Sequence, residues 1–158
     1  MESRVRLASE HDVESIVKLL KKGKLNVEGI ENHIENFLVV EQMGSHQIVG
    51  TAGLEVIGED YGLLRSLVID PACLDPKIGM ELVRILLSFA IGKGLQEIYF
   101  ITRSKDFFEY FGCTEVSGPD VPWSIQQSRH FQQSKSDLST VMVYKKVNNQ
   151  GQNNLNEM

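Results

Sequence analysis

The sequence contains little cysteine. Only Cys73 and Cys113 occur in 158 residues, too few for the disulfide frameworks of small secreted domains. Neither cysteine has a second cysteine at the short spacing of a zinc site, and the four histidines show no ligand spacing either. We therefore expect no metal, and two small buried or half-buried thiols.

Basic residues are also in deficit, and long apolar runs are missing. Lys and Arg number 16 against 21 Asp and Glu, a net charge of −5, whereas proteins that neutralise a phosphate backbone carry the opposite balance. No stretch approaches the roughly 20 apolar residues of a membrane helix, and residues 1–6 hold no apolar segment typical of a signal peptide. The sequence predicts no nucleic-acid partner, no membrane association and a cytoplasmic location.

The remaining composition is that of an ordinary folded domain, with alternating helix and strand signals. The predicted elements are a strand at 4–7, a helix from Ser9 to about Lys22, a short helix at 28–35, strands at 37–40, 48–57 and 61–69, a helix at 78–93, a strand at 97–101, a short aromatic helix around 107–111, a strand at 114–116, a helix begun by Asp120 or Val121, and a strand at 140–144. The strands at 37–69 form an antiparallel meander, and the long helix connects two parallel strands. The sequence predicts one mixed α/β domain at 1–147 and a disordered Asn/Gln-rich tail at 148–158.

This order of elements resembles the GNAT superfamily of acyl-CoA-dependent N-acetyltransferases. Three stretches carry the likeness: Leu67-Val68-Ile69-Asp70-Pro71, Ile78-Gly79-Met80-Glu81-Leu82, and Asp106-Phe107-Phe108-Glu109-Tyr110-Phe111-Gly112. Residues 101–108 and 121–125 resemble the amino-acid acetyltransferase branch, which includes acetylglutamate synthase domains. Residues 50–55 and 63–68 resemble the small arsenic-resistance N-acetyltransferases. The resemblance implies a central, mostly antiparallel mixed sheet flanked by helices, acetyl-CoA as cosubstrate, and a small amino-acid-like amine as acceptor.

The resemblance also implies where acetyl-CoA binds. The residues implied are Leu67, Val68, Ile69, Lys77, Ile78, Gly79, Met80 and Phe108. In the family, backbone N–H groups of a glycine-rich loop hold the pyrophosphate at the start of the long helix. A backbone N–H at the end of the preceding strand, here Leu67, stabilises the oxyanion of the reaction. Phe108 stands where many members have a proton-donating tyrosine.

The glycine-rich loop departs from the family pattern. The aligned stretch is Leu74-Asp75-Pro76-Lys77-Ile78-Gly79, in which only the last glycine remains. Pro76 has no N–H to offer, and Asp75-Pro76 is typical of a helix start that caps itself. The Asp75 carboxylate would then occupy donors meant for phosphate, whereas Lys77 would offer a positive charge.

Polar residues among the apolar strands are candidates for chemistry. Glu55 is the candidate general base, because it ends a strand near the expected site. Arg65 and Arg103 are candidates for binding an acceptor carboxylate, since a guanidinium can bind it through two hydrogen bonds; pairing with a structural carboxylate is the alternative for each. Ser66 and Thr102 add hydroxyl groups.

Two functions follow from these residues. The first is an N-acetyltransferase that moves an acetyl group from acetyl-CoA to a small amino-acid-like amine by direct attack on the thioester. The alternative is a domain of the same fold with weak or lost acetyl-CoA binding that senses a ligand or binds a partner. The loop at 74–79 and Phe108 favour the alternative, and the two arginines favour the enzyme. The resemblance leaves a homodimer open.

Overall fold

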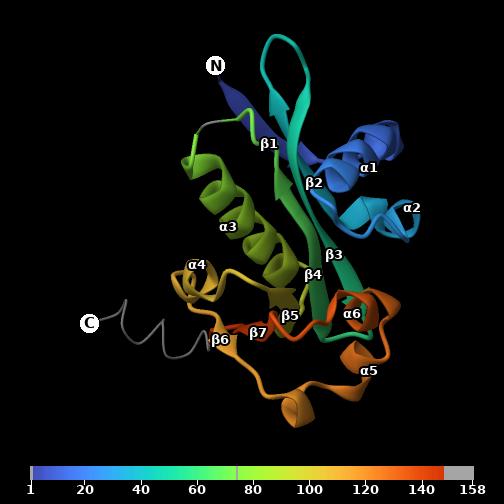
Figure 1. The fold of residues 1–158 in the computed structure, drawn as a ribbon, viewed down its shortest axis with the longest axis vertical. Coiled ribbons are helices and arrows are strands. Elements are labelled where there is room, and N and C mark those ends of the chain that lie inside the picture. Colours follow the sequence, from blue (N-terminus) through green and yellow to red (C-terminus); the bar gives the residue numbers. More distant parts are fainter. Residues whose placement is uncertain (1, 74, 148–158) are drawn as a thin grey trace.

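A single mixed sheet forms the centre of the protein. The computed structural model describes residues 2–73 and 75–147. Within them, the sheet has the strand order β1-β2-β3-β4-β5-β7-β6 (Figure 1). The strands are β1 (Ser3–Leu7), β2 (Phe37–Gln42), β3 (Ile48–Ile57), β4 (Tyr61–Ile69), β5 (Glu97–Thr102), β6 (Thr114–Glu115) and β7 (Thr140–Lys145). Neighbouring strands are antiparallel except β4 and β5, which are parallel. The expected fold class is confirmed.

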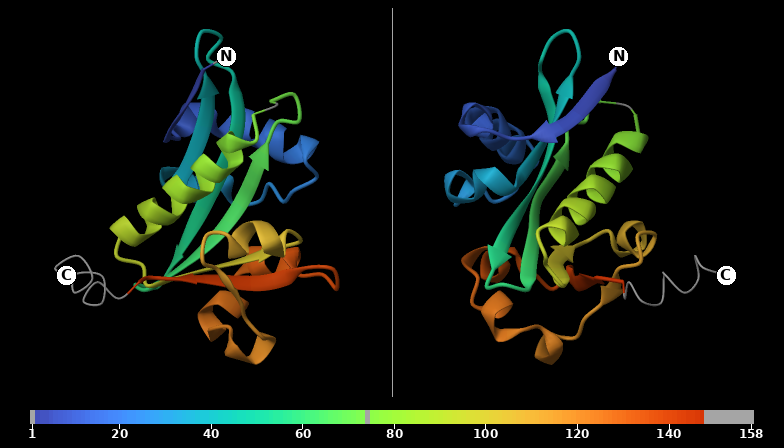
Figure 2. Two further views of the ribbon diagram at one scale, coloured as in Figure 1. Left: turned by 90° about the vertical axis from the view of Figure 1, so that its left-hand side faces the viewer. Right: turned by 180° about the vertical axis from the view of Figure 1, so that it is seen from behind.

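Helices cover both faces of this sheet, as the right-hand view of Figure 2 shows. On one face lie α1 (Val13–Lys22), α2 (Ile30–His33), α5 (Trp123–Gln126) and α6 (Arg129–Ser134); on the other lie α3 (Lys77–Gly92) and α4 (Lys105–Glu109). Fully buried Ile16 and Leu20 of α1 pack on Phe37, and buried Leu82 and Leu86 of α3 belong to the core on the opposite face. Apolar residues spaced three to four apart therefore direct each helix to its face.

Several predicted boundaries differ from the structure. The helix expected from Ser9 begins as a 3₁₀ turn (Glu10–Asp12) before α1, and the helix expected at 28–35 is α2 followed by a 3₁₀ turn (Ile34–Asn36). Neither Asp120 nor Val121 caps α5: a 3₁₀ turn (Gly118–Asp120) precedes it, and Pro122 is its N-cap residue. Short polar segments form these turns because they lack enough apolar positions to hold a longer helix. The tail expected at 148–158 lies outside the described residues.

The parallel strands β4 and β5 separate at their carboxyl ends. They pair only through Tyr61 with Glu97, Gly62 with Ile98 and Leu63 with Tyr99. Beyond these residues β4 continues against β3 and β5 continues against β7. An opening between β4 and β5 is the consequence, and the connection through α3 returns the chain beside it.

Both cysteines are free thiols within the core, as expected. Cys113 is buried, and burial raises the pKa of its thiol to about 11; Cys73 is half-buried. No helix among the described residues is long and apolar enough to cross a membrane.

An ionic cluster ties the first strand to the rest of the sheet. Arg6 donates to both carboxylate oxygens of Asp12, at 2.9 Å each, and to Glu41 Oε1 at 3.2 Å. These hydrogen bonds from Arg6, together with the Ser9 N–H, hold the pKa of Asp12 below its usual range. The ionised carboxylate therefore stabilises the folded state.

Acid is expected to weaken this cluster. Because the pKa of Asp12 is lower in the folded than in the unfolded chain, its contribution is complete above the unfolded pKa of about 4 and is lost as the pH falls through the lowered value. We expect Asp12→Asn to reduce the free energy of unfolding by about 1–3 kcal/mol at pH 7, because the charged partner of Arg6 is lost. The variant should also lose less stability than the wild type between about pH 5 and 2. Urea unfolding at several pH values measures both effects, with the exposed Asp137→Asn as control; parallel pH curves for wild type and Asp12→Asn would contradict the assignment.

Candidate active site

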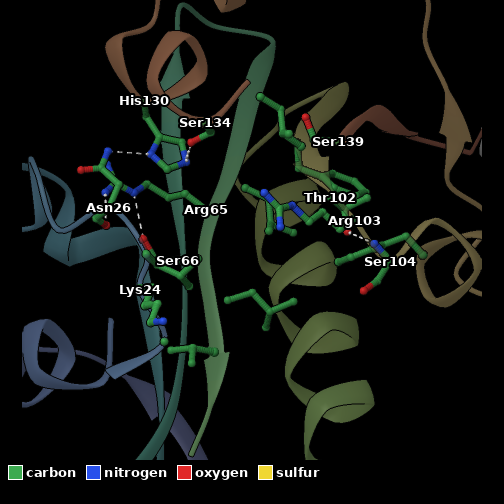
Figure 3. A pocket seen from close by; sticks show the side chains of 18 of the residues that line it. Lys24, Asn26, Arg65, Ser66, Thr102, Arg103, Ser104, His130, Ser134 and Ser139 are labelled. Carbon is green, nitrogen blue, oxygen red and sulfur yellow. Dashed lines mark hydrogen bonds between the residues drawn. The ribbon is translucent and has the colours of Figure 1, made fainter. Parts of the chain in front are cut away.

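A cavity of about 1060 Å³ occupies the opening between β4 and β5 (Figure 3). We call it the central cavity. Its wall is formed by residues 64–69 of β4, residues 100–104 at the end of β5, Phe107 and Phe108 of α4, Gly79 of α3, residues 23–26 after α1, and residues 130, 133–136 and 139 of α6 and the loop that follows. The space between splayed parallel strands is where open α/β sheets commonly bind ligands.

A β-bulge shapes the β4 wall. Thr51 pairs with Val68, but Gly53 pairs with Arg65, so β4 has one extra residue over this stretch. Ser66 takes up the extra residue with a positive φ of 61°, which is unusual for a residue other than glycine.

The bulge leaves backbone donors directed at the central cavity. The N–H of Asp70 donates to Val49 O of β3 at 2.7 Å. Because successive N–H groups of a strand point in alternate directions, the N–H of Val68 also faces β3, whereas those of Leu67 and Ile69 face the opening. The side chains of Leu67, Val68 and Ile69 are half-buried and line the cavity. The structure therefore brings together three residues that the resemblance implied for acetyl-CoA.

The start of α3 caps itself. Asp75 Oδ1 accepts the N–H of Lys77 at 3.0 Å, and the Asp75 carbonyl accepts the N–H of Ile78 at 3.3 Å. One N–H that a phosphate would use is thus occupied. Leu74, which stands in the aligned loop, lies outside the described residues.

Only part of the first turn of α3 reaches the central cavity. Gly79 lines it, whereas Lys77, Ile78 and Met80 do not. Ile78 instead lines a smaller cavity of about 210 Å³ between α3 and the strands β1 and β2. Of the four residues in this turn that the resemblance implied for acetyl-CoA, only Gly79 lines the central cavity.

Phe108 forms the apolar floor of the central cavity. It is 4% exposed, and its ring centroid lies 4.4 Å from that of Phe100. A phenyl ring has no proton to give. Tyr110, two residues later, is 73% exposed and does not line the cavity.

The cavity wall is positively charged although the chain is negatively charged. Its charged lining residues are Lys24, Arg65, Arg103 and Lys135, and no Asp or Glu is among the lining residues that the structure describes. The net charge of the whole chain is −5. A wall of this kind attracts anions and repels free ammonium groups.

The two predicted arginines differ in their surroundings. Arg65 lines the cavity, but its buried guanidinium donates to Glu55 Oε2 at 2.6 Å, Ser66 Oγ at 2.9 Å and Glu28 O at 2.8 Å. Arg103 is exposed and has no ion pair within residues 2–73 and 75–147. The alternative of a structural carboxylate partner therefore holds for Arg65, and Arg103 presents its charge to the cavity beside Thr102 and Ser104 (Figure 3).

Glu55 does not line the central cavity. It lies on β3 opposite Leu63, where β4 and β5 are still paired. Its carboxylate accepts from Arg65, and its Oε1 lies 3.7 Å from His33 Nε2. Because Leu63 is the last residue of β4 that pairs with β5, Glu55 lies next to the start of the opening, behind Arg65, but it is not among the residues that line the cavity.

His130 lines the cavity, although the spacing of the histidines in the sequence indicates no site. Asn26 Nδ2 lies 3.3 Å from His130 Nδ1, and Ser134 Oγ lies 3.3 Å from His130 Nε2. Burial, with the positive charge of Arg65, lowers the pKa of the imidazole to about 4, so the ring is neutral at neutral pH. The amide of Asn26 can only donate to an unprotonated Nδ1, which agrees with a neutral ring.

Sequence reasoning found the strand residues of the cavity and missed its loop residues. The predicted acceptor residues Arg65, Ser66, Thr102 and Arg103 all line the cavity. The missed residues come from the segment after α1, from α6 and from the loop that follows α6: Lys24, Asn26, His130, Gln133, Ser134, Lys135, Ser136 and Ser139. The two aromatic residues of α5 and α6 do not line the cavity: Trp123 is 72% exposed, and Phe131 is 3% exposed in the core. Within the described residues, no group of three or more His, Cys, Asp or Glu side chains could hold a metal ion.

Residues 10–112 match the model of the acetyltransferase (GNAT) family. An amino-acid acetyltransferase of Mycobacterium tuberculosis is 32% identical over 124 residues, which cover 74% of this chain and 71% of that protein.

Two solved structures share the fold. One is a Mycobacterium tuberculosis protein in complex with CoA and a second ligand, with a TM-score of 0.74 and 23% identity, covering 91% of this chain and 99% of that one. The other is N-acetylglutamate synthase from Neisseria gonorrhoeae complexed with coenzyme A and N-acetyl-glutamate, with a TM-score of 0.75 and 22% identity, covering 94% of this chain and 36% of that one. The chain is a member of the GNAT family of acetyltransferases.

Proposed function

We propose that the protein transfers the acetyl group of acetyl-CoA to the amine of a small amino-acid-like acceptor. The observation that carries the proposal is the charge of the central cavity, whose lining includes Lys24, Arg103 and Lys135 in addition to the Arg65 paired with Glu55, and no described carboxylate. An amino acid presents a carboxylate that such a wall attracts. A related amino-acid acetyltransferase and structural neighbours with bound CoA support the same reading.

The chemistry requires few side chains. The neutral amine nitrogen attacks the thioester carbon, and the N–H of Leu67 is placed to donate to the developing oxyanion. The C–S bond then breaks, and CoA leaves as a thiolate. The proton released from nitrogen as the amide forms passes to sulfur through water, because Phe108 cannot supply one. The positive wall favours the neutral form of the bound amine. The reaction therefore does not require Glu55, which does not line the cavity, as a general base.

Ser66 and Thr102 provide hydroxyl groups beside these donors, and Gly79 leaves space for the pyrophosphate to approach the start of α3. Lys77, Ile78 and Met80 would contribute backbone N–H groups or, for Lys77, charge. Val68 and Ile69 would contact the pantetheine chain of the cosubstrate, with Phe108 below the thioester.

The test is a panel of amino acids, each paired with the amine that lacks its carboxylate. The purified protein is incubated with acetyl-CoA, and acetylated products are detected by mass spectrometry. We expect turnover of one or a few amino acids and at least about 100-fold weaker turnover of the matching amines, since charge-assisted hydrogen bonds to the carboxylate would be lost. Equal turnover of both members of each pair, or none, would contradict the proposal.

The alternative function, a ligand-sensing or partner-binding domain, is favoured by the Asp75 hydrogen bond at the start of α3. If Asp75 competes with phosphate for the Lys77 N–H, Asp75→Gly should bind acetyl-CoA more tightly, by about 2–10-fold, the value of one hydrogen bond. Calorimetry measures the dissociation constant, and Asp75→Asn, which keeps an accepting oxygen but no charge, separates hydrogen bonding from repulsion. Unchanged or weaker binding by Asp75→Gly would exclude competition. Acetyl-CoA binding without turnover of any acceptor would favour the sensor.

A further inference from the structure

Arg65 connects two parts of the cavity wall, the bulge in β4 and the segment between α1 and α2. Its side chain is 1% exposed and is directed toward Asn26 and His130 in Figure 3. We propose that Arg65 is a positioning residue: it holds the β-bulge that presents the Leu67 N–H and, at the same time, the segment at residues 26–28, which contributes Asn26 to the cavity wall beside α6. This inference rests on the proposed function, and it replaces direct binding of the acceptor by Arg65.

The first connection runs to the bulge. Arg65 Nε donates to Ser66 Oγ at 2.9 Å, and Ser66 is the residue whose positive φ creates the bulge. A left-handed serine costs of order 1 kcal/mol and persists only where its surroundings hold it. The hydrogen bond from Arg65 provides such a hold next to Leu67, whose N–H faces the cavity.

The second connection runs to the segment between α1 and α2. Arg65 Nη2 donates to Glu28 O at 2.8 Å and lies 3.4 Å from Asn26 O. Asn26 lines the cavity, and its amide donates to Gln133 Oε1 of α6 at 2.9 Å. The Glu28 carboxylate accepts from Gln133 Nε2 at 2.9 Å and pairs with Arg129 Nε at 2.9 Å.

These contacts connect α6 to Arg65 indirectly, through residues 26 and 28. Val27 packs with the apolar cluster of α1, and Phe131 of α6 packs with a separate cluster that includes Leu63 and Tyr99. The side-chain contacts described between the segment and α6 are hydrogen bonds and one ion pair, and exposed contacts of this kind contribute little individually. The buried guanidinium is therefore the polar anchor of the segment on β4, in addition to the apolar packing of Val27.

The geometry requires arginine. The guanidinium offers five donors in a fixed plane, which lets one side chain reach Ser66, Glu55 and two backbone carbonyls in different directions. Glu55 neutralises it at 2.6 Å on the side away from the cavity. Lysine would keep the charge near Glu55 but has a single nitrogen, so it cannot hold the bulge and the segment together.

The experiment compares Arg65 with Arg103, a second arginine in the wall that has no ion pair in the described part of the chain. Arg65→Met, Arg65→Lys and Arg103→Met are assayed with the acceptor found in the panel. For Arg65→Met we expect kcat to fall by about 100-fold, the effect of a displacement of about 1 Å at a reacting group. For Arg65→Lys the loss should be partial. For Arg103→Met the effect should fall on the acceptor KM, and acetyl-CoA affinity should stay within about 3-fold of the wild type.

Amide hydrogen exchange supplies a readout that does not need turnover. Exchange in peptides covering 25–29 and 65–68 should increase in both Arg65 variants and stay at the wild-type level in Arg103→Met. Arg65→Lys serves if Arg65→Met fails to fold, because it retains a cation beside Glu55.

The outcomes separate the inference from the proposed function. A rise in acceptor KM with unchanged kcat in Arg65→Met, matching Arg103→Met, would make Arg65 an acceptor ligand and overturn the inference. Unchanged exchange in both peptides would also overturn it. If the wild type acetylates no acceptor, the proposed function fails, and increased exchange in both segments still supports Arg65 as the residue that joins them.

Discussion

Gly79→Leu is expected to weaken acetyl-CoA binding by about 100-fold or more without destabilising the protein. Gly79 lies in the first turn of α3 and lines the central cavity. A Cβ at this position would meet Ile69 Cγ1 at 4.0 Å, an ordinary contact distance. The fold therefore has space for a Cβ atom here, and packing at that atom does not require glycine.

The expected loss comes from the approach of the pyrophosphate. A glycine lets phosphate oxygens reach the backbone N–H groups of a helix start, and a leucine side chain holds them away. Loss of two charge-assisted hydrogen bonds costs about 3 kcal/mol or more, which corresponds to roughly 100-fold in affinity. Stability should rise by about 0.5–1 kcal/mol, because leucine has a higher helix propensity than glycine.

Calorimetry with acetyl-CoA and urea unfolding measure the two quantities. Gly92→Leu is the matched control, since Gly92 ends the same helix and a Cβ there would meet nothing within 4 Å. It should leave acetyl-CoA affinity unchanged. Wild-type affinity in Gly79→Leu would mean that the cosubstrate does not use the start of α3.

The strands and the long helix were predictable because local signals bound them. The turn residues Gly58-Glu59-Asp60 separate two strands of alternating pattern, and the structure has β3 and β4 with the predicted bounds. The apolar surface of residues 78–93 predicts a buried helix, and α3 ends within one residue of that range. Such elements depend on periodicity within a short window.

The bulge in β4 could not be predicted from the periodicity of the sequence. Glu55 lies opposite Leu63 in the hairpin, so Arg65 is its diagonal neighbour, and this pairing follows once the register is known. The extra residue at Ser66 breaks that register, and a serine with positive φ has no sequence signal comparable to glycine. The direction of the Leu67 N–H therefore became visible only in the structure.

The part of the cavity wall formed by residues 23–26 and α6 could not be predicted for a different reason. Asn26 and Gln133 are 107 residues apart, one in a loop and the other in the short helix α6, and they meet through their polar side chains. Amide side chains in such segments are usually solvated, and no period distinguishes those that line a cavity. The same holds for His130, which is half-buried where α6 lies beside the loop at Asn26.

Arg103→Met is expected to raise the KM for the acceptor by about 100-fold and to leave kcat within about 3-fold. The Arg103 side chain lines the cavity at the end of β5, beside Thr102, whose hydroxyl accepts the N–H of Ser104 at 2.9 Å. Within the described residues no carboxylate pairs with it. Its donors are available to an acceptor carboxylate, and two such hydrogen bonds account for a loss of this size.

The pattern across substrates is the decisive readout. Initial rates are measured for the amino acid and for the amine that lacks its carboxylate, with wild type and Arg103→Met. If Arg103 binds the carboxylate, the substitution changes KM for the amino acid and has almost no effect on the amine, because the amine offers nothing for the guanidinium to hold. Arg84→Met, on the exposed side of α3 where Arg84 pairs with Glu81, should leave both substrates unaffected. A KM that rises equally for both substrates would mean that Arg103 shapes the cavity rather than recognising the acceptor, and the positive wall would then need Lys24 or Lys135 as its carboxylate ligand.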